Sequence, residues 1–497
     1  MGVAESGNIG AAVAGGKRNP KVIIVGTGLS GVCMGIRLME AGFTDVTLYE
    51  KAGGLGGTWY YNFYPGLRCD VPSYYYQYSF SPSASWSHRF CGGPEIQQYY
   101  ETTAKKYNVF ERIKFNSEVK HSEFRGGKWH VDLENGDTDE ADILIACCGI
   151  LVRPKYPEIE GMDDFEGKIL HTARWERDID LTGKNVAVIG NGSTGIQMIK
   201  PLTEICKKVY SFQRTPQWIV PVPNRKYSKL NEKMLTTFPV ISKVFHHSIS
   251  YFMETIMGTG VIKDGWARRI VGKACQWNLN NVKDPKLRKA LTPDYVAMCK
   301  RLVMSSEFYP AIQKPNAELI SEHIERFEAK GIRTKDGELH EVDVVALATG
   351  YYAGEHMMPM TMSVEDGPTL EEQWKDGIYG YRTVAMPDFP NFFMVMGPNS
   401  PVGNFSLAAI AEVQSGYIMN FVEKWANREF EKVSPKRAAT DRFVQDMKDN
   451  MEGTVWLTGC DSWYLDKNGV PVSWPWTAGK FRNDLKVPDY SEYEMER

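Results

Sequence analysis

The sequence lacks three features that mark common protein classes: patterned cysteines, blocks of basic residues and long apolar runs. Its nine cysteines are an odd number without metal-like or CxxC spacing, which argues against a disulfide framework, a zinc site and thioredoxin-type chemistry. The 58 Lys and Arg and 61 Asp and Glu side chains leave a net charge of −3. We therefore expect no metal and neither nucleic acid nor a membrane as a partner.

No apolar run approaches the length that spans a bilayer, and residues 1–16 lack the basic and apolar segments of a signal peptide. We therefore expect a reduced, soluble, cytoplasmic protein. Residues 1–19 are rich in Gly and Ala without a periodic pattern, which predicts a disordered tail. The chain length suggests roughly three domain-sized units. The oligomeric state stays open, and a monomer is compatible with the sequence.

A first dinucleotide-binding motif begins at Gly26. A short apolar strand (22–25) leads into the loop Gly26-Thr27-Gly28-Leu29-Ser30-Gly31, and a helix (32–40) follows. The glycines allow a tight turn and let a pyrophosphate approach the helix N-terminus. A second strand ends at Glu50, whose carboxylate can accept hydrogen bonds from both ribose hydroxyls. This arrangement is typical of FAD or NAD and not of NADP.

A second motif repeats this order. A strand (186–189) leads into Gly190-Asn191-Gly192-Ser193-Thr194-Gly195, and a helix from Ile196 follows. Arg214 lies as far beyond Gly190 as Glu50 lies beyond Gly26. A guanidinium at this position suits a 2′-phosphate. The chain is therefore predicted to hold FAD at the first motif and NADPH at the second. A solvated surface cation is the alternative interpretation of Arg214.

Two similar segments close the two units, residues 142–149 and 343–350, and each follows an expected hairpin. We predict an α/β fold with two dinucleotide-binding, Rossmann-like domains, the NADPH domain inserted in the FAD domain, plus a helical insertion. The predicted boundaries are 20–150 and 351–497 for the FAD-binding domain, 151–220 and 301–350 for the NADPH-binding domain, and 221–300 for the helical insertion. No CxxxxC pair accompanies the first unit, which disfavours a flavin disulfide reductase.

An apolar stripe at three- and four-residue steps crosses the helical insertion. It consists of Phe238, Ile241, Val244, Phe245, Ile249, Phe252 and Ile256. We interpret the stripe as a core face that packs on the nucleotide domains. A membrane foot is the alternative, disfavoured by Lys243 and Glu254 within the stripe and by the absence of flanking basic clusters.

Two further motifs resemble those of the Baeyer–Villiger monooxygenases. The first is Gly56-Gly57-Thr58-Trp59 with Tyr64-Pro65-Gly66 and Asp70. The second is the fingerprint FxGxxxHxxxW, matched by Phe165, Gly167, His171 and Trp175 in the joint between the two units. The resemblance extends from residue 21 to about Trp463. It departs at Glu176, where the family usually has Pro or Asp, and this leaves room for the sister family of flavin-containing monooxygenases.

The resemblance implies an NADPH-consuming, FAD-dependent monooxygenase. Such an enzyme inserts one oxygen atom from dioxygen next to a ketone carbonyl, through a flavin peroxide, and forms an ester or lactone. This chemistry needs a fixed cation near the flavin, and Arg is suitable because it does not lose its proton. The resemblance assigns the role to Arg301, oriented by Asp70. A surface ion pair is the alternative interpretation, and without the resemblance the sequence gives no reason to expect that the two residues meet.

The same resemblance implies further contacts. Lys300 and Arg214 would bind the 2′-phosphate, and Trp463 would reach the nicotinamide, although a core position is the alternative for this tryptophan. Other residues in contact with the cofactors would be Thr58, Trp59, Asp70, Tyr76, Val119 and Thr215. His171 is interpreted as a residue that fixes the conformation of a hinge between the two units and not as a general base.

Two other functions compete with ketone oxygenation. One is oxygenation of nitrogen or sulfur nucleophiles, which has less need of an oxyanion clamp. The other is a non-catalytic, sensory flavoprotein. The pair Asp70 and Arg301 favours the ketone reaction over both, and an aromatic content of 12% favours an apolar ketone.

Overall fold

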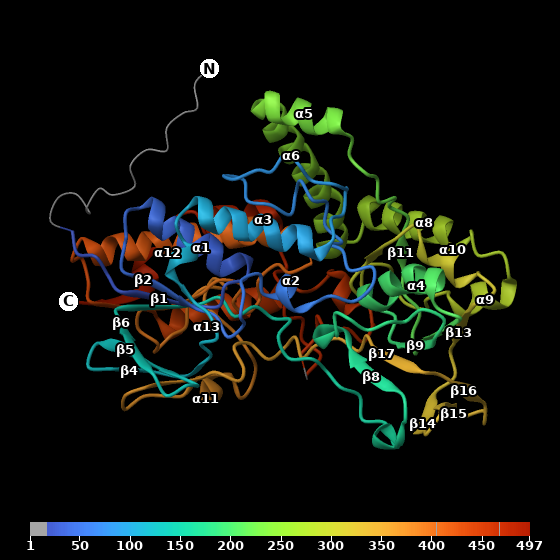
Figure 1. Ribbon diagram of the computed structural model, residues 1–497. Helices are drawn as coiled ribbons and strands as arrows, with labels where there is room; N and C mark the ends of the chain where they lie inside the picture. Colours follow the sequence, from blue (N-terminus) through green and yellow to red (C-terminus); the bar gives the residue numbers. More distant parts are fainter. Residues whose placement is uncertain (1–16, 404, 467) are drawn as a thin grey trace.

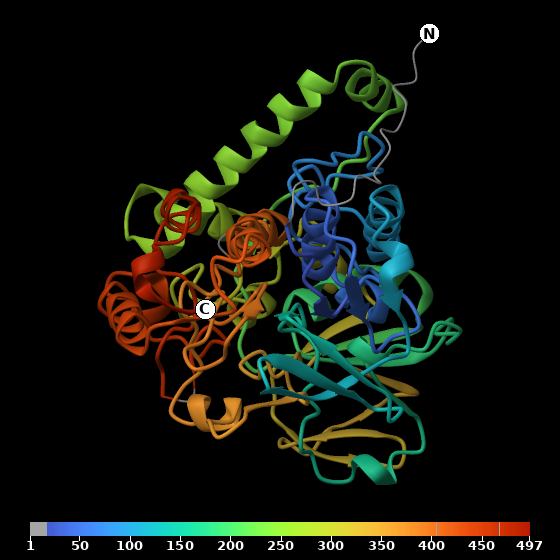
Figure 2. The same ribbon diagram turned by 90° about the vertical axis from the view of Figure 1, so that its left-hand side faces the viewer.

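The computed structural model of the chain describes residues 17–403, 405–466 and 468–497. Two parallel sheets form the body, and a helical projection rises from it (Figures 1 and 2). The predicted α/β class with two Rossmann-like units is confirmed. Among the described residues, no helix is both long and apolar enough to cross a lipid bilayer.

The first parallel sheet has the strand order β19-β7-β1-β2-β3. Its strands are β1 (Val22–Val25), β2 (Val46–Tyr49), β3 (Ile113–Lys114), β7 (Ile143–Ala146) and β19 (Phe392–Met394). The strand β19 comes from a late part of the chain and pairs with β7. Residues beyond the second dinucleotide motif therefore complete the sheet that carries the first motif.

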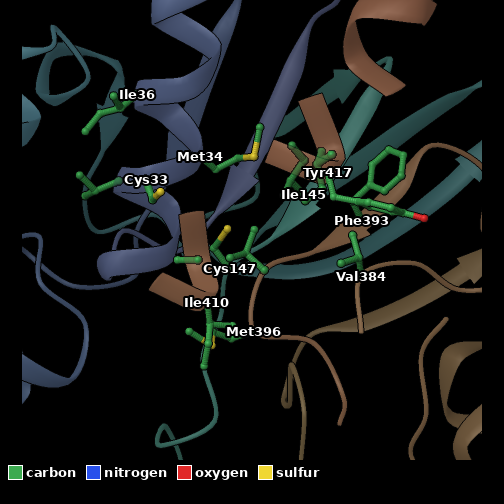
Figure 3. Packing of buried hydrophobic residues seen from close by; sticks show 14 of the residues in the cluster. Cys33, Met34, Ile36, Ile145, Cys147, Val384, Phe393, Met396, Ile410 and Tyr417 are labelled. Carbon is green, nitrogen blue, oxygen red and sulfur yellow. The ribbon is translucent and has the colours of Figure 1, made fainter. Parts of the chain in front are cut away.

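Alternate side chains of this sheet enter two different cores. Val22, Ile24 and Ile145 pack against the helices α1 (Leu29–Glu40) and α12 (Leu407–Ala426), which lie side by side (Figures 1 and 3). Ile23 and Leu144 pack on the other side. That side is covered by a four-stranded sheet of β18 (Thr361–Val364), β4 (Val119–Arg125), β5 (Lys128–Leu133) and β6 (Thr138–Ala141). Burial on both faces explains why these strands are continuously apolar.

The second parallel sheet repeats this layered arrangement, with the order β13-β10-β9-β17-β8. Its strands are β8 (Lys168–His171), β9 (Asn185–Ile189), β10 (Lys208–Phe212), β13 (Ala317–Ile320) and β17 (Val344–Leu347). One face packs on α4 (Ser193–Ile205) and α10 (Phe308–Ile312). The other packs on the antiparallel strands β14 (Ile324–Glu328), β15 (Gly331–Thr334) and β16 (Leu339–Glu341). Both predicted hairpins are confirmed, as β5–β6 and β15–β16.

Both motif helices begin earlier than the sequence predicts. The helix α1 begins at Leu29 and α4 at Ser193, three residues before the expected starts at 32 and 196. The final glycine of each loop, Gly31 or Gly195, therefore lies inside the first helical turn. An added Cβ on either would lie 1.9 Å from the carbonyl oxygen of the loop's first glycine. The turn can close this tightly only because both positions lack a side chain.

Smaller elements complete the body. The helices are α2 (Thr58–Tyr61), α3 (Gly93–Lys106), α11 (Leu370–Trp374), α13 (Arg437–Asp449) and α14 (Ala478–Asp484). Two strand pairs are β11 (Ile219–Val220) with β12 (Val303–Met304), and β20 (Lys432–Pro435) with β21 (Tyr493–Glu496). Of the predicted tail, residues 1–16 lie outside the described residues. Arg18 donates to Glu431 and to the Trp425 carbonyl oxygen, so the start of the described chain is held against α12.

The helical insertion contains α5 (Lys229–Thr237), α6 (Pro239–Met253), a π-helical turn η4 (Glu254–Gly258), α7 (Thr259–Ile262), α8 (Trp266–Leu279) and α9 (Pro285–Ala290). The prediction that its apolar stripe is a core face holds only for part of the stripe, since Ile249 and Ile256 pack against buried clusters. Phe238, Ile241, Val244, Phe245 and Phe252 are 38–59% exposed. Helical periodicity shows that one face is apolar but not what covers it, and α6 runs along the outside of the molecule (Figure 2).

Replacement of Gly31 by Ala is expected to destabilise the first unit. The added Cβ must displace the Gly26 carbonyl, and overpacking of this kind lowers the free energy of unfolding by about 1–3 kcal/mol. We expect a lower Tm and less bound dinucleotide in the purified protein. Gly416 in α12 is the matched control, because an added Cβ there meets no described atom within 4 Å. A Gly31→Ala protein as stable as Gly416→Ala would contradict the packing argument.

Candidate active site

A cavity of about 710 Å³ lies where the two dinucleotide loops meet. This volume is within the range of about 300–1,000 Å³ that small-molecule sites occupy. Most of the predicted site residues line it: Gly26, Gly28, Leu29, Ser30, Glu50, Thr58, Trp59, Asp70, Tyr76, Val119, Gly192, Ser193, Thr194, Lys300, Arg301 and Trp463. Gly31, Gly190, Gly195, Arg214 and Thr215 are not part of the lining.

The first loop has the geometry of a phosphate cradle. Gly26 has a φ of +100°, and a Cβ there would lie 2.6 Å from the Cys147 carbonyl oxygen, so the loop lies directly on the end of β7. The helix α1 begins after Gly28, and no side chain of the described residues caps it. Its free N–H groups and the positive end of its dipole can therefore receive a pyrophosphate.

Glu50 is held in place at the end of β2. Its Oε2 accepts hydrogen bonds from the backbone N–H and the hydroxyl of Thr27, at 2.9 and 2.8 Å. Its Oε1 accepts one from the Ala52 N–H at 2.9 Å. The carboxylate is buried in the cavity wall with acceptor capacity to spare. It is therefore suitable for a ribose hydroxyl.

The second loop repeats the first in detail. Gly190 has a φ of +107°, and an added Cβ would lie 2.4 Å from the Ala348 carbonyl oxygen at the end of β17. The Asn191 amide donates to the Thr215 carbonyl oxygen at 2.8 Å, which fixes the segment after β10 beside the loop. Arg214 in this segment is exposed. The structure thus holds it near the second loop but outside the cavity.

Arg301 and Asp70 form a bidentate ion pair inside the cavity. Arg301 Nε donates to Asp70 Oδ2 at 2.9 Å, and Nη2 donates to Oδ1 at 2.7 Å. The Asp70 carboxylate raises the pKa of the Arg301 guanidinium further above its ordinary value, against the opposite effect of burial. The Arg301 side chain remains one-third exposed, at 33%. A permanent cation in a fixed plane therefore faces the cavity.

Tyr464 is a site residue that the sequence did not reveal. It lies beside Arg301, and burial raises the pKa of its phenol, so the hydroxyl stays protonated at neutral pH. Its ring stacks on Trp463 with centroids 4.1 Å apart. Trp463 is 38% exposed on the cavity wall, so the core alternative for this tryptophan is wrong. The only sequence signal for Tyr464 was its position next to Trp463.

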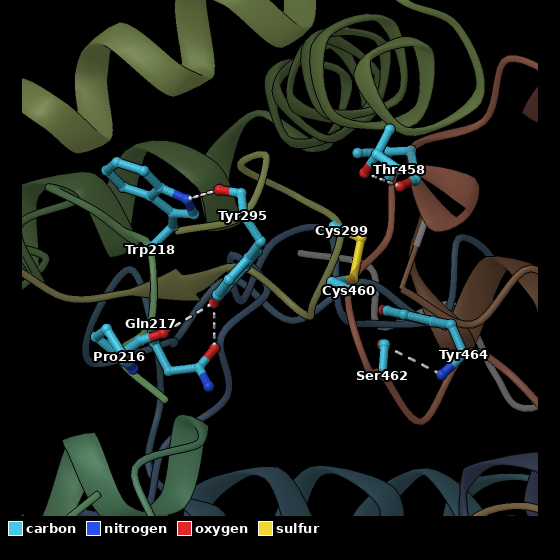
Figure 4. The surroundings of a disulfide bond; sticks show 10 residues. Pro216, Gln217, Trp218, Tyr295, Cys299, Thr458, Cys460, Ser462 and Tyr464 are labelled. Carbon is cyan, nitrogen blue, oxygen red and sulfur yellow. Dashed lines mark hydrogen bonds between the residues drawn. A yellow bond between two sulfur atoms is a disulfide. The ribbon is translucent and has the colours of Figure 1, made fainter. Parts of the chain in front are cut away.

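The structure contains one disulfide, which the expectation of a reduced protein did not include. Cys299 and Cys460 are joined, with their Cα atoms 6.1 Å apart (Figure 4). The other seven cysteines are free. The two partners are 161 positions apart in sequence, and spacing carries no signal over such a distance. The bond ties the segment before Arg301 to the segment that carries Trp463 and Tyr464.

The fingerprint residues Phe165, Gly167, His171 and Trp175 do not line the cavity. They hold the edge strand β8 in place instead. Phe165 packs on Phe327, and an added Cβ on Gly167 would lie 2.5 Å from the Asp343 carbonyl oxygen. Trp175 is buried in the core of the second unit. Glu176, the departure from the family pattern, forms an ion pair with Lys168 on the surface.

His171 ends β8 and is buried. Its Nδ1 accepts a hydrogen bond from the Ala173 N–H at 3.1 Å, which caps the short 3-10 turn that follows. Burial lowers the pKa of His171 to about 4. The imidazole is therefore neutral at physiological pH, and its visible role is to shape the turn after β8.

Comparisons with known proteins agree on one family. The model of the flavin-binding monooxygenase-like family matches residues 19–365. An uncharacterized monooxygenase of Mycobacterium tuberculosis is 45% identical, with 97% of each chain covered. A Baeyer–Villiger monooxygenase of Streptomyces coelicolor is 33% identical, over 96% of this chain and 93% of the relative. The crystal structure of a cyclohexanone monooxygenase from Rhodococcus sp. Phi1, bound to NADP+, has a TM-score of 0.85 and 26% identity, over 96% of this chain and 99% of that one.

The state of His171 predicts how stability depends on pH. The folded pKa of about 4 lies below the ordinary value of 6.5. The unfolded chain therefore binds a proton that the folded chain does not, and stability falls as the pH decreases from 6.5 towards 4. Between pH 7.5 and pH 5 the loss due to this residue should be about 2 kcal/mol. Urea unfolding should show a smaller loss over this range for His171→Gln, and an unchanged loss would argue against the assignment.

The disulfide predicts a thiol count. Alkylation of the unreduced, denatured protein, followed by mass spectrometry, should label seven cysteines, because Cys299 and Cys460 are joined. Reduction before alkylation should raise the number to nine. Nine labels without reduction would show that the two thiols are free in solution. As a control, Cys299→Ser should leave Cys460 available for labelling.

Proposed function

The chain belongs to the flavin-binding monooxygenase-like family, in its Baeyer–Villiger branch, and we propose that it oxidises ketones. One oxygen atom of dioxygen is inserted next to the carbonyl, to give an ester or lactone, and NADPH is consumed. The observation that carries the proposal is the bidentate Arg301–Asp70 pair in a cavity lined by both dinucleotide loops. The names of the relatives support the same reaction.

The first loop and Glu50 would hold FAD. The uncapped N-terminus of α1 would bind its pyrophosphate, and Glu50 a ribose hydroxyl. Thr58, Trp59, Tyr76 and Val119 line the same cavity and would contact the rest of the cofactor. When bound, FAD accepts a hydride from NADPH and activates dioxygen.

The second loop would hold NADPH. The N-terminus of α4 is also without a side-chain cap in the described chain, and Ser193 and Thr194 face the cavity. Lys300 on the cavity wall and the exposed Arg214 would bind the 2′-phosphate. Thr215 would assist from the segment that Asn191 holds. Trp463 would pack against the nicotinamide side of the cavity.

The chain would thus comprise an FAD unit with an inserted NADPH unit. The boundaries proposed are 20–150 and 351–497 for the first, 151–220 and 301–350 for the second, and 221–300 for the helical insertion. The pairing of β19 with β7 supports the discontinuous first unit. The edge strand β8 lies in the joint, and the role proposed for His171 is to fix the conformation of this hinge.

Arg301 would act on the substrate carbonyl. As a ketone is attacked, its oxygen gains negative charge, and a fixed cation stabilises that charge most when solvent is excluded. Asp70 fixes the guanidinium plane, and Tyr464 beside it presents a protonated hydroxyl. Oxygenation of nitrogen or sulfur nucleophiles develops no such oxyanion and is not favoured by this arrangement.

Arg301→Ala tests this function. We expect ester formation to fall by about 10²–10³-fold or more, because a preorganised oxyanion partner is lost. Reduction of the flavin by NADPH should persist, since the hydride step does not involve the carbonyl. Stopped-flow absorbance would follow flavin reduction, and mass spectrometry would follow products from linear, cyclic and aryl ketones.

Arg301→Lys keeps the charge but not the bidentate geometry, so its activity should be intermediate. Arg112→Ala, an exposed arginine outside the cavity, should behave as wild type. Undiminished ester formation by Arg301→Ala would overturn the assignment. Oxygenated amines or sulfides as the sole products of the wild type would overturn the function itself.

A further inference from the structure

The projection formed by α5 and α6 exposes an unusual amount of apolar surface. Of the 21 large hydrophobic side chains found exposed among the described residues, nine lie between positions 230 and 252. They are Leu230, Met234, Phe238, Val240, Ile241, Val244, Phe245, Tyr251 and Phe252. Exposed apolar residues scattered singly are normal, but a cluster of this density marks an interaction surface.

The outer face of α6 is the most exposed part. Val240, Val244 and Tyr251 are 72%, 59% and 74% exposed. Their spacing of four and seven residues places them on one side of the helix. The opposite side faces the body, where His246 hydrogen-bonds to the Tyr74 carbonyl oxygen at 2.6 Å. Val240, Val244 and Tyr251 therefore point away from the protein.

The same segment is basic in an acidic chain. Residues 225–253 contain Arg225, Lys226, Lys229, Lys233 and Lys243 against one acid, Glu232, whereas the whole chain has a net charge of −3. All five cations are exposed. No described carboxylate forms an ion pair with any of them. The sequence showed no consecutive basic block; in the structure Lys229 and Lys233 lie on α5 and Lys243 on α6, whereas Arg225 and Lys226 precede α5.

We propose that the α5–α6 projection docks on an anionic lipid surface, with the outer face of α6 in the interface between headgroups and acyl chains. An apolar helix face of Val, Phe and Tyr that carries Lys243, next to a helix with two further exposed lysines, has the composition of an interfacial segment. The exposed lysines match negatively charged headgroups. The helix α6 continues through η4 into α7, but no helix among the described residues is long and apolar enough to cross a bilayer. It lies on the membrane and does not cross it.

A second copy of the chain fits this surface less well. A twofold contact through α5 and α6 would bring Lys229, Lys233 and Lys243 of one protomer near the same three lysines of the other. Like charges across an interface oppose association, and the segment has only one acid with which to compensate. The charge thus favours an anionic surface over self-association.

The base of α6 links the projection to the cavity. Glu254, at its end, accepts a hydrogen bond from the Tyr75 hydroxyl at 3.0 Å and forms an ion pair with Arg482. Met253 and Met257, on either side of it, line the cavity. One anchored helical segment therefore extends from the apolar outer face to the wall of the cavity, and docking would place the cavity beside the lipid.

Flotation with vesicles tests the proposal, using the full-length protein with its flavin. The vesicles contain roughly two parts phosphatidylcholine to one part phosphatidylglycerol, an anionic composition to which basic amphipathic helices bind. Wild-type protein should float with these vesicles, and far less with phosphatidylcholine alone or in high salt. The variant Val240→Ser/Val244→Ser/Tyr251→Ser should bind at least about tenfold more weakly.

Two further variants test the contribution of the lysines and whether the effect of apolar substitutions is specific to the projection. Lys229→Glu/Lys233→Glu/Lys243→Glu should lose binding to anionic vesicles. Ile205→Ser/Val487→Ser, which removes exposed apolar side chains outside the projection, should bind as wild type does. Flavin absorbance and Tm should match the wild type for every variant, because the substituted side chains are exposed.

Two results would overturn the proposal. The first is a failure of the wild-type protein to float with anionic vesicles, or equal flotation of the wild type and the Val240, Val244 and Tyr251 variant. The second is sedimentation without lipid that shows a dimer which these substitutions convert to a monomer, since the surface would then bind a second copy. Neither result depends on catalytic activity, so both are independent of the proposed reaction.

Discussion

The bidentate contact between Arg301 and Asp70 is the interaction on which the site depends. Asp70 belongs to the first dinucleotide unit, whereas Arg301 follows the helical insertion. A guanidinium without a bidentate partner can rotate. Two parallel hydrogen bonds to Asp70 fix the plane of the Arg301 guanidinium and leave it facing the cavity. Tyr464 lies beside the pair, and the disulfide at Cys299 restrains both segments. Three distant parts of the chain are thereby held around one cation.

The two dinucleotide units solve the same steric problem in the same way. In each, a loop glycine lies so close to a carbonyl oxygen of the neighbouring strand that a Cβ would overlap it. In each, a second glycine allows the helix to begin within the loop and to present free N–H groups to the cavity. Each parallel sheet then has helices on one face and a small sheet on the other. The cavity forms where these two similar edges meet.

The helical insertion follows a different rule. Its α6 has a helical apolar period, yet most side chains on that face are exposed. The insertion also contacts the body, through His246 on Tyr74 and, at the base of α6, through Glu254 on Tyr75 and Arg482. An exposed apolar surface of this kind marks an interaction site, and the positive charge of the segment favours anionic lipid as the partner. The same segment lines the cavity through Met253 and Met257.

The sequence by itself determined what depends on local backbone chemistry. The loops at Gly26 and Gly190, their flanking strands and the hairpins follow from short-range sterics and alternation, and the structure has them. The pairing of Arg301 with Asp70 was expected only through a family resemblance, because no local rule brings residues 231 positions apart together. Tertiary structure alone decided the Cys299–Cys460 bond, the place of Tyr464 beside Arg301 and the exposure of α6. Periodicity specifies that a face is apolar, but which partner covers it depends on how the whole chain packs.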